Sequence, residues 1–269
     1  MTKTISNEYK DYWNESVKDL AMQGDFIELL NKEDEDITWK SIIYGVPKGA
    51  MSFACRAATN SLATNDNLVR WGKKSNSKCD LCSNKGSLCH VLNSCQKMLQ
   101  DGRYTWRHDN ILHALAKLLR ENKKDHISFY VDIPKYNING GTVPPNIVTT
   151  SERPDIVVID NSTSPTTVLI YELTCPFETN IENAHAFKSD KYSSLGSDIE
   201  DNGYSCMLVA FEIGSRGFIP RRVKLSLCSL LIQTTNIKKP FKIMKFLSKL
   251  SLLSSYSIFH SRKETQSVV

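Results

Sequence analysis

The hydrophobic positions of the chain switch between a helical and a strand-like period, and each switch marks an element. Helical spacing with one apolar face predicts helices at 104–120, 179–195, 220–233 and 240–256. Short apolar runs bounded by polar turns predict strands at 127–132, 155–160, 167–174 and 204–211. Alternating helices and strands predict an α/β fold in which helices cover a sheet.

The N-terminal region has a weaker pattern. A helical spacing that includes Tyr12, Trp13 and Val17 precedes an acidic run at 33–36, so residues 1–45 are expected to be a peripheral helical extension. A turn and a further helix are predicted between 42 and 71, directly before a group of cysteines.

Composition alone does not identify a class of protein, because 41% hydrophobic and 23% charged residues are typical of an ordinary globular protein. The distribution of charge is more informative. Residues 41–150 carry 15 basic and 7 acidic side chains and residues 214–269 carry 11 and 1, whereas residues 1–40 carry 5 and 10 and residues 151–213 carry 3 and 11. Basic blocks favour polyanions such as nucleic acid, and an acidic middle suits a cation site. Solvated faces would explain each block alone equally well.

The N-terminus lacks the apolar stretch of a secretory signal, and no apolar run approaches the ~20 residues of a membrane span. We therefore expect a protein that is not secreted and has no membrane partner. In a reducing compartment, clustered cysteine and histidine favour metal over disulfides.

A cysteine and histidine string has the spacing of a zinc knuckle. Cys79 and Cys82 form a C-x2-C turn, and His90 and Cys95 follow as the second pair of ligands. Four nitrogen or sulfur ligands close a tetrahedral structural Zn²⁺ site. Cys89 fits the spacing less well than its neighbour. Basic residues around the string favour phosphate contact, although such loops also serve protein contacts; they include Lys73, Lys74 and Lys78.

The strands at 155–160 and 167–174 predict a hairpin that holds a metal. If Asp160 pairs with Thr167 across the turn at 161–166, Asp155 lies opposite Glu172. Cross-strand partners have Cβ atoms about 5 Å apart, so both carboxylates can bind one divalent cation such as Mg²⁺. A surface hairpin with solvated acids is the plain alternative. It is weakened because Glu172 interrupts an apolar strand, where an unpartnered carboxylate is costly.

Metal-dependent nucleases of the Pro-Asp…(Asp/Glu)-x-Lys type add a lysine to this carboxylate pair, but Thr174 stands at the lysine position. The next predicted helix offers a substitute, since Lys188 lies on its inward stripe and Lys191 and Tyr192 flank the same face. The alternative is a lysine whose stem packs on the helix while its amine reaches solvent. His108 lies on the stripe of the helix at 104–120, as a core residue or as a further metal or phosphate contact.

Taken together, these motifs resemble the C-terminal region of site-specific non-LTR (LINE-type) retrotransposon proteins. The likeness runs from about Pro47 to Arg262 and rests on the zinc string, the Arg107-His108-Asp109 triplet, the Arg153-Pro154-Asp155 hairpin with Glu172, the displaced lysines, and the segment 212–217. The resemblance implies a restriction-endonuclease-like PD-(D/E)xK core, a mixed sheet flanked by helices, at 101–269. It implies a helix and a zinc knuckle at 46–100 before that core.

The resemblance also implies a function. We expect a Mg²⁺-dependent endonuclease that nicks DNA, with Asp155 and Glu172 as metal ligands and with Lys188, Lys191 and Tyr192 at the catalytic centre. DNA is the expected partner, with RNA as a second; a reverse transcriptase encoded elsewhere and a nuclear location, otherwise a cytoplasmic one, follow from the same likeness. A zinc-knuckle protein that binds nucleic acid without catalysis is the alternative. Predicted nucleic-acid contacts, beyond the knuckle lysines, are Arg107, His108, Arg153, Arg216, Arg221 and Arg222.

Overall fold

The computed structural model describes residues 8, 11–12, 15–16, 20, 24–32, 38–137 and 141–264. Trp13, Val17 and the acidic run 33–36 of the predicted N-terminal extension lie outside the described residues. The helices with assigned bounds are α2 (Gly24–Lys32), α3 (Thr38–Ile43), α4 (Lys48–Ala58), α5 (Asn65–Arg70), α6 (Gln96–Gln100), α7 (Arg103–Asn122), α8 (Ile181–Lys191), α9 (Ser193–Asp201), α10 (Arg221–Thr234) and α11 (Pro240–His260). A π-helical turn, η1 (His90–Ser94), and a 3-10 turn, η2 (Glu178–Asn180), complete them.

A four-stranded mixed sheet forms the centre, in the order β1 (Ile127–Val131), β2 (Ile156–Asp160), β3 (Thr167–Thr174) and β4 (Ser205–Glu212). β1 pairs with β2 and β2 with β3 in antiparallel fashion, whereas β3 and β4 are parallel. The parallel pair requires a crossover, and α8 and α9 provide it. The predicted mixed α/β architecture is confirmed at this level.

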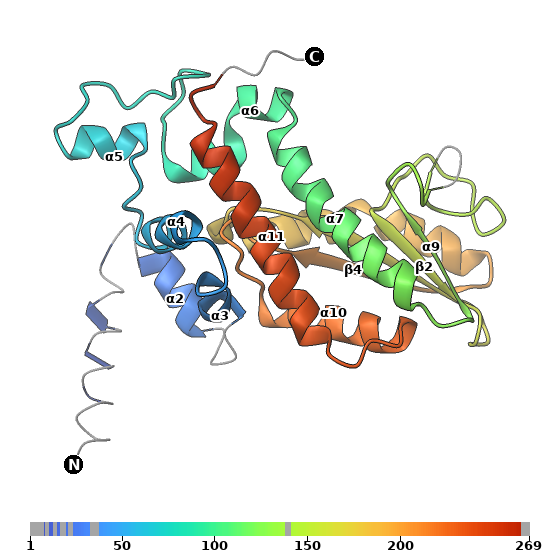
Figure 1. The fold of residues 1–269 in the computed structure, drawn as a ribbon. Helices are drawn as coiled ribbons and strands as arrows, with labels where there is room; N and C mark the ends of the chain where they lie inside the picture. Colours follow the sequence, from blue (N-terminus) through green and yellow to red (C-terminus); the bar gives the residue numbers. More distant parts are fainter. Residues whose placement is uncertain are drawn as a thin grey trace.

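Helices cover both faces of the sheet (Figure 1). One face packs against α7, α10 and α11, which supply the buried residues Leu115, Leu227 and Leu247. The other face packs against the crossover helices through Leu195 and Ile199 of α9. The interiors of β2 and β3 are buried on both faces, and apart from Glu172 their buried side chains are apolar.

The predicted single helix at 179–195 is wrong in its continuity. It divides at Tyr192 into α8 and α9, and Tyr192 has non-helical backbone angles of φ −106° and ψ 11°. The ring of Tyr192 is fully buried, and its hydroxyl donates to the carbonyl of Arg153 at 3.2 Å. Anchoring the ring in the core and bonding its hydroxyl to the segment before β2 stabilises the break, which lies next to the predicted site.

The N-terminal helices and the sheet domain share one long helix. The C-terminal half of α11 packs Leu252, Ile258 and Phe259 into a second core with Phe53 of α4 and Leu92 of η1. Its N-terminal half packs against the sheet side through Ile243 and Leu247. In Figure 1, α11 and α7 lie side by side between the two regions. Among the described helices, none combines the length and the apolarity needed to cross a membrane.

A candidate metal centre beside a zinc-binding knuckle

The four predicted zinc ligands converge. The ligand atoms of Cys79, Cys82, His90 and Cys95 all lie within 4.8 Å of one another. Cys95 Sγ is 3.9 Å from Cys79 Sγ and 3.6 Å from Cys82 Sγ, and His90 Nε2 is 3.1 Å from Cys82 Sγ. Sulfur ligands on a tetrahedral Zn²⁺ are about 3.8 Å apart, given Zn–S bonds of about 2.3 Å. The cluster therefore fits zinc, and Cys89 is exposed and takes no part.

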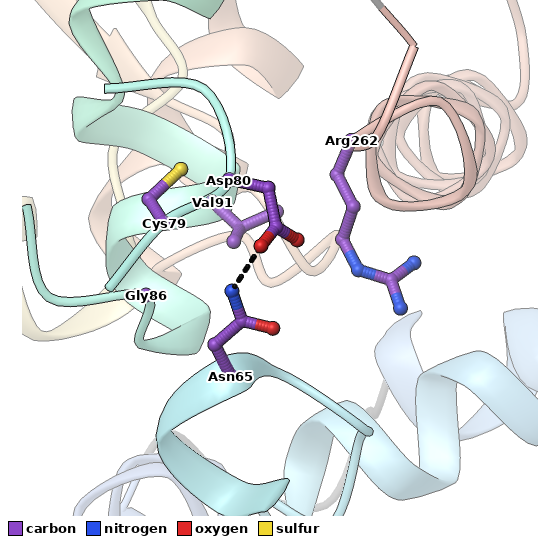
Figure 2. A pocket seen from close by; sticks show the side chains of 6 residues that line it. All are labelled: Asn65, Cys79, Asp80, Gly86, Val91 and Arg262. Carbon is purple, nitrogen blue, oxygen red and sulfur yellow. Dashed lines mark hydrogen bonds between the residues drawn. The ribbon is translucent and has the colours of Figure 1, made fainter. Parts of the chain in front are cut away.

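The knuckle loop is held from outside by α5. Thr64 caps this helix by accepting from the amide of Asn67, and the cap places Asn65 against the loop. Asn65 Nδ2 donates to the carbonyl of Lys78 at 2.5 Å and to Asp80 Oδ1 at 3.0 Å. Figure 2 shows Asn65, Cys79 and Asp80 around a small pocket that Arg262 also lines. Such contacts fix ligand orientation, so the zinc geometry depends on residues outside the four ligands.

We expect Gly86→Ala to loosen the knuckle. A Cβ at residue 86 would lie 3.0 Å from Asn65 Cβ and 3.0 Å from the carbonyl oxygen of Ser77, closer than ordinary packing allows. Overpacking of this kind costs about 1–3 kcal/mol. The measurement is the free energy of unfolding in urea. Gly196→Ala in α9 is the control, because its Cβ meets only Cys206 Sγ at 3.9 Å and helical alanine is about 1 kcal/mol better than glycine. Equal effects of the two changes would contradict the packing argument.

The predicted hairpin register is confirmed. Asp160 pairs with Thr167, and the ladder runs back to Ile156 opposite Tyr171. Continuing the register by one residue places Asp155 beside Glu172, at the point where β2 begins and β3 continues with β4 alone. Both acids are buried, and their side chains are 12% and 4% exposed.

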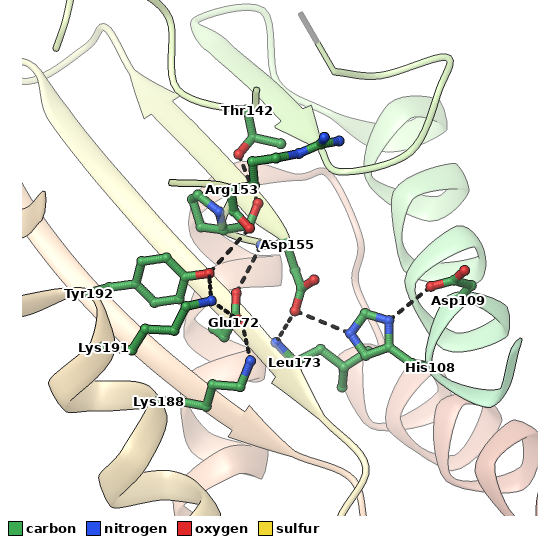
Figure 3. A network of polar contacts seen from close by, with 11 residues as sticks. His108, Asp109, Thr142, Arg153, Asp155, Glu172, Leu173, Lys188, Lys191 and Tyr192 are labelled. Atoms are coloured by element: carbon green, nitrogen blue, oxygen red, sulfur yellow. Dashed lines mark hydrogen bonds and ion pairs between the residues drawn. The ribbon is translucent and has the colours of Figure 1, made fainter. Parts of the chain in front are cut away.

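The two carboxylates replace the last rungs of the ladder. Glu172 Oε2 accepts from the backbone amide of Asp155 at 3.0 Å, and Asp155 Oδ2 accepts from the amide of Leu173 at 2.7 Å. Each acid is therefore fixed by the backbone of the opposite strand. The Arg153-Pro154 segment is fixed as well, since Thr142 Oγ1 donates to the carbonyl of Pro154 at 2.8 Å. Figure 3 shows both carboxylates pointing into one polar network.

The lysines of α8 reach this network. Lys188 Nζ forms a short ion pair with Glu172 Oε1. Lys191 Nζ lies 3.9 Å from the same oxygen and donates to the hydroxyl of Tyr192 at 2.6 Å. Lys188 and Lys191 thus approach one carboxylate from the crossover helix, while Thr174 on β3 carries no charge. The predicted proximity of these residues to the hairpin is present in the structure.

His108 approaches from the opposite side. Its Nε2 lies 3.2 Å from Asp155 Oδ2 and its Nδ1 lies 3.0 Å from Asp109 Oδ1. The ring bridges two carboxylates, and α7 begins only a few residues earlier, at Arg103. His108 is thus a neighbour of the acidic pair, where the sequence suggested either a core residue or a contact to metal or phosphate.

The electrostatics of the pair reflect its burial and the charged groups around it. Burial raises the pKa of Glu172, and repulsion by Asp155 raises it further, although Lys188 lowers it. Burial lowers the pKa of His108, but its bonds to Asp109 and Asp155 outweigh burial and raise that pKa to about 11. Lys188 and His108 thus lie against the two buried carboxylates and offset their charge.

The residues present suit Mg²⁺ bound through few protein ligands. Among the described residues, only the zinc string brings three or more ligand groups together. Mg²⁺ prefers oxygen, keeps several waters, and is usually held by one or two carboxylates with substrate phosphates. Asp155 and Glu172 are two carboxylates of the kind that this donor set requires.

Two of the residues predicted to contact nucleic acid are buried and are not at the surface of the described structure. Arg107 is 1% exposed and donates to the carbonyls of Leu92 and Cys175 at 2.9 and 3.0 Å and to Ser255 Oγ at 3.0 Å. Arg216 is 4% exposed, and its Nε lies 2.6 Å from Glu178 Oε2. Both guanidinium groups bind acceptors inside the protein. Arg107 links the knuckle to the end of β3 and to α11. Sequence patterns show that a residue is basic but not which way it points.

The other predicted basic contacts differ in exposure. Lys73 and Lys78 are exposed, and Lys73 Nζ lies 5.9 Å from the ring centroid of Trp71. Lys74 is paired with Asp80 at 2.9 Å, and Arg153 with Asp132 at 2.5 Å. Arg221 is exposed at the start of α10, and Arg222 is half-buried. Their contact with nucleic acid stays a prediction.

One polar group near the hairpin was missed. Glu212, at the end of β4, is fully buried and contacts His185 of α8 and Arg222 of α10. The signal for it was an acid directly after the predicted apolar strand at 204–211. Without the parallel pairing of β3 with β4, nothing in the sequence placed Glu212 beside the hairpin.

Comparison with known proteins identifies the N-terminal region alone. Residues 22–100 match the family model described as zinc-binding in reverse transcriptase. The match contains all four members of the cysteine and histidine cluster and α2 to α6, so residues 22–100 are similar to the zinc-binding domain of reverse-transcriptase elements. A search of curated proteins found no match.

Proposed function

We propose that the protein is a metal-dependent DNA endonuclease that nicks one strand, built on a restriction-like core and derived from a non-LTR retroelement. The observation that carries the proposal is the meeting of two buried carboxylates, Asp155 and Glu172, with Lys188 on the free edge of Glu172. The zinc-binding match supports the retroelement origin, because a zinc knuckle precedes the nuclease in the proteins that the sequence resembles.

In the proposed mechanism the carboxylates and the lysine have separate roles. Asp155 and Glu172 would hold Mg²⁺, which polarises the scissile phosphate and lowers the pKa of a bound water. Lys188 steadies the charge that develops on the phosphate, a role that preorganised cations perform well in a site shielded from water. The backbone amides of Asp155 and Leu173 fix both carboxylates before substrate arrives. This rigidity reduces the reorganisation that the reaction requires.

The knuckle supplies the nucleic-acid context. Lys73, Lys78 and Trp71 are exposed on it and combine positive charge with an aromatic ring suited to base stacking. Arg107 ties the knuckle to the end of β3, so a strand held by the knuckle would be presented to the sheet domain at a fixed position. A reverse transcriptase that uses the nick as primer is the proposed partner.

The test is a plasmid-nicking assay with the purified, zinc-loaded protein. With Mg²⁺, supercoiled plasmid should become open circles, and with Ca²⁺ or without divalent metal it should stay supercoiled. Zinc should remain bound in every arm, as checked by metal analysis, so that metal dependence reports the hairpin and not the knuckle. Equal nicking in the presence of a magnesium chelator that leaves zinc in place would overturn the proposal.

We expect Lys188→Met to reduce the nicking rate about 10²-fold, because it removes the cation on Glu172 while keeping an unbranched stem. Lys191→Met should reduce the rate far less, since Lys191 Nζ is 3.9 Å from Glu172 and is engaged by Tyr192. Single-turnover rates of the two variants are the measurement. Equal losses would show that the two lysines share the role.

A nucleic-acid-binding protein without catalysis is the second candidate. The observation that favours it is that both oxygens of Glu172 are already engaged, one by Lys188 and one by the amide of Asp155. In that case the lysine would replace the metal permanently. DNA binding that is unaffected by Mg²⁺, together with no nicking, would support this reading.

A further inference from the structure

A second polar group lies on the same face of the sheet as the acidic pair. Glu172 is paired with Ala210 in the parallel ladder, and Glu212 follows two residues later on β4. The two-residue period of a strand puts Glu172 and Glu212 on one face of the sheet. The same helix covers both, because Lys188 reaches Glu172 and His185, one turn earlier on α8, reaches Glu212.

Glu212 holds two partly exposed groups in place. Its Oε1 lies 2.9 Å from His185 Nδ1, and its Oε2 lies 3.2 Å from the guanidinium of Arg222. The carboxylate is 0% exposed, whereas the side chains of His185 and Arg222 are 35% and 34% exposed. A buried acid that orients two solvent-facing nitrogen groups is the arrangement that proteins use to preorganise a ligand site.

The donors of this group are not all used. Arg222 contacts two carboxylates but its Nε is buried without a hydrogen-bond partner, and Thr174 Oγ1, which faces Glu212 in the ladder, is also buried and unpartnered. Buried polar atoms nearly always have partners, so these two atoms leave hydrogen-bonding capacity unused at this end of the sheet.

The remaining contact of Arg222 shows the chemistry of that group. Arg222 Nη1 binds Glu182 Oε1 at 2.6 Å, and the Glu182 side chain is 78% exposed. The guanidinium of Arg222 is therefore held by the buried carboxylate of Glu212 and is contacted on its solvent side by the exposed carboxylate of Glu182. An exposed pair of this kind contributes at most about 1 kcal/mol, so another oxyanion can displace it. Arginine is well suited to phosphate oxygens, which it binds with paired N–H groups.

We propose that Arg222 and His185, positioned by Glu212, bind a backbone phosphate of the nucleic-acid strand next to the phosphate held at Asp155 and Glu172. Glu182 occupies this subsite when no strand is bound. The inference deepens the proposed nuclease function and rests on it for the identity of the ligand. His185 Nδ1 lies 2.9 Å from Glu212, so the other ring nitrogen, Nε2, is the one available to the strand.

The test is the affinity for a short fluorescein-labelled DNA duplex, measured by anisotropy in Ca²⁺ across a series of salt concentrations. Arg222→Gln should weaken binding about tenfold and reduce the slope of log affinity against log salt by about one. Glu212→Gln, which cannot touch the strand, should act in the same direction. Glu182→Gln should strengthen binding about threefold, because it removes the competing anion.

Glu121→Gln on α7 is the matched control for the loss of one exposed acid, and it should leave affinity unchanged. A purely structural Arg222 would make Glu182→Gln equal to Glu121→Gln, and that outcome overturns the subsite even if Arg222→Gln lowers the melting temperature. The readout is independent of cleavage. Absent nicking with the expected shifts would overturn the nuclease alone, and normal nicking without them would overturn the subsite alone.

Discussion

Asp155→Asn should abolish Mg²⁺-dependent nicking, with a loss of at least about 10³-fold in the single-turnover rate. The substitution removes one of two charged metal ligands, and metal-derived stabilisation of the transition state is worth several kcal/mol, with each 1.4 kcal/mol equal to a factor of ten. The amide oxygen of asparagine can still accept from Leu173, so the local backbone should hold. This variant should therefore separate catalysis from folding.

The measurement pairs nicking rates with Mg²⁺ titration calorimetry. The variant should bind Mg²⁺ more weakly and bind DNA in Ca²⁺ with little change, because Asp155 is 12% exposed and faces its own network. Asp132→Asn is a matched control: Asp132 lies close in sequence and is paired with Arg153, but it is not part of the facing pair. Nicking that survives Asp155→Asn would exclude the hairpin as the catalytic centre.

Cys95→Ser should release zinc and unfold the knuckle. Cys95 is fully buried and lies within 3.9 Å of both other cysteine ligands, so no water can replace its sulfur without rearrangement. Structural zinc contributes apparent folding energies of about 10–16 kcal/mol in zinc-finger peptides. Losing even part of this stabilisation should lower the free energy of unfolding more than the other substitutions proposed for this chain.

The measurement is zinc content by native mass spectrometry together with thermal melting. Wild-type protein should carry one zinc ion per chain, and Cys95→Ser should carry none and melt far lower. Cys89→Ser is the closest control, because Cys89 is the sequence neighbour of His90 yet is exposed. Equal zinc loss in both variants, or full zinc retention in Cys95→Ser, would contradict the ligand assignment.

The sequence predicted the parts of the molecule that local spacing determines. Pairing Asp160 with Thr167 fixed the whole hairpin register, because every further pair follows from it, and the C-x2-C turn with His90 and Cys95 fixed the zinc cluster. The position of Lys188 followed from helical spacing, although the helix itself breaks at Tyr192. These predictions depend on residues close together in the chain.

Contacts between residues far apart in the chain could not be predicted from the sequence. Arg107 is separated from Cys175 by 68 residues and from Ser255 by 148, and nothing local distinguishes it from a surface arginine. Arg216 likewise finds Glu178 across 38 residues. Burial of a cation depends on the acceptors that tertiary packing gathers around it. Glu212 belongs to the same class, because its neighbours come from two different helices.

Because α11 packs into both hydrophobic cores, the two described regions cannot be separated without exposing apolar surface. A cut between residues 100 and 101 would remove Phe259 and Leu252 from the hydrophobic surroundings of Phe53 and Leu92, and would leave apolar surface on both fragments. Separate expression of the two parts should therefore give poorly soluble pieces, whereas the intact chain folds as one unit. The zinc knuckle in this form therefore depends on α11 for its packing, and through α11 it is joined to the sheet.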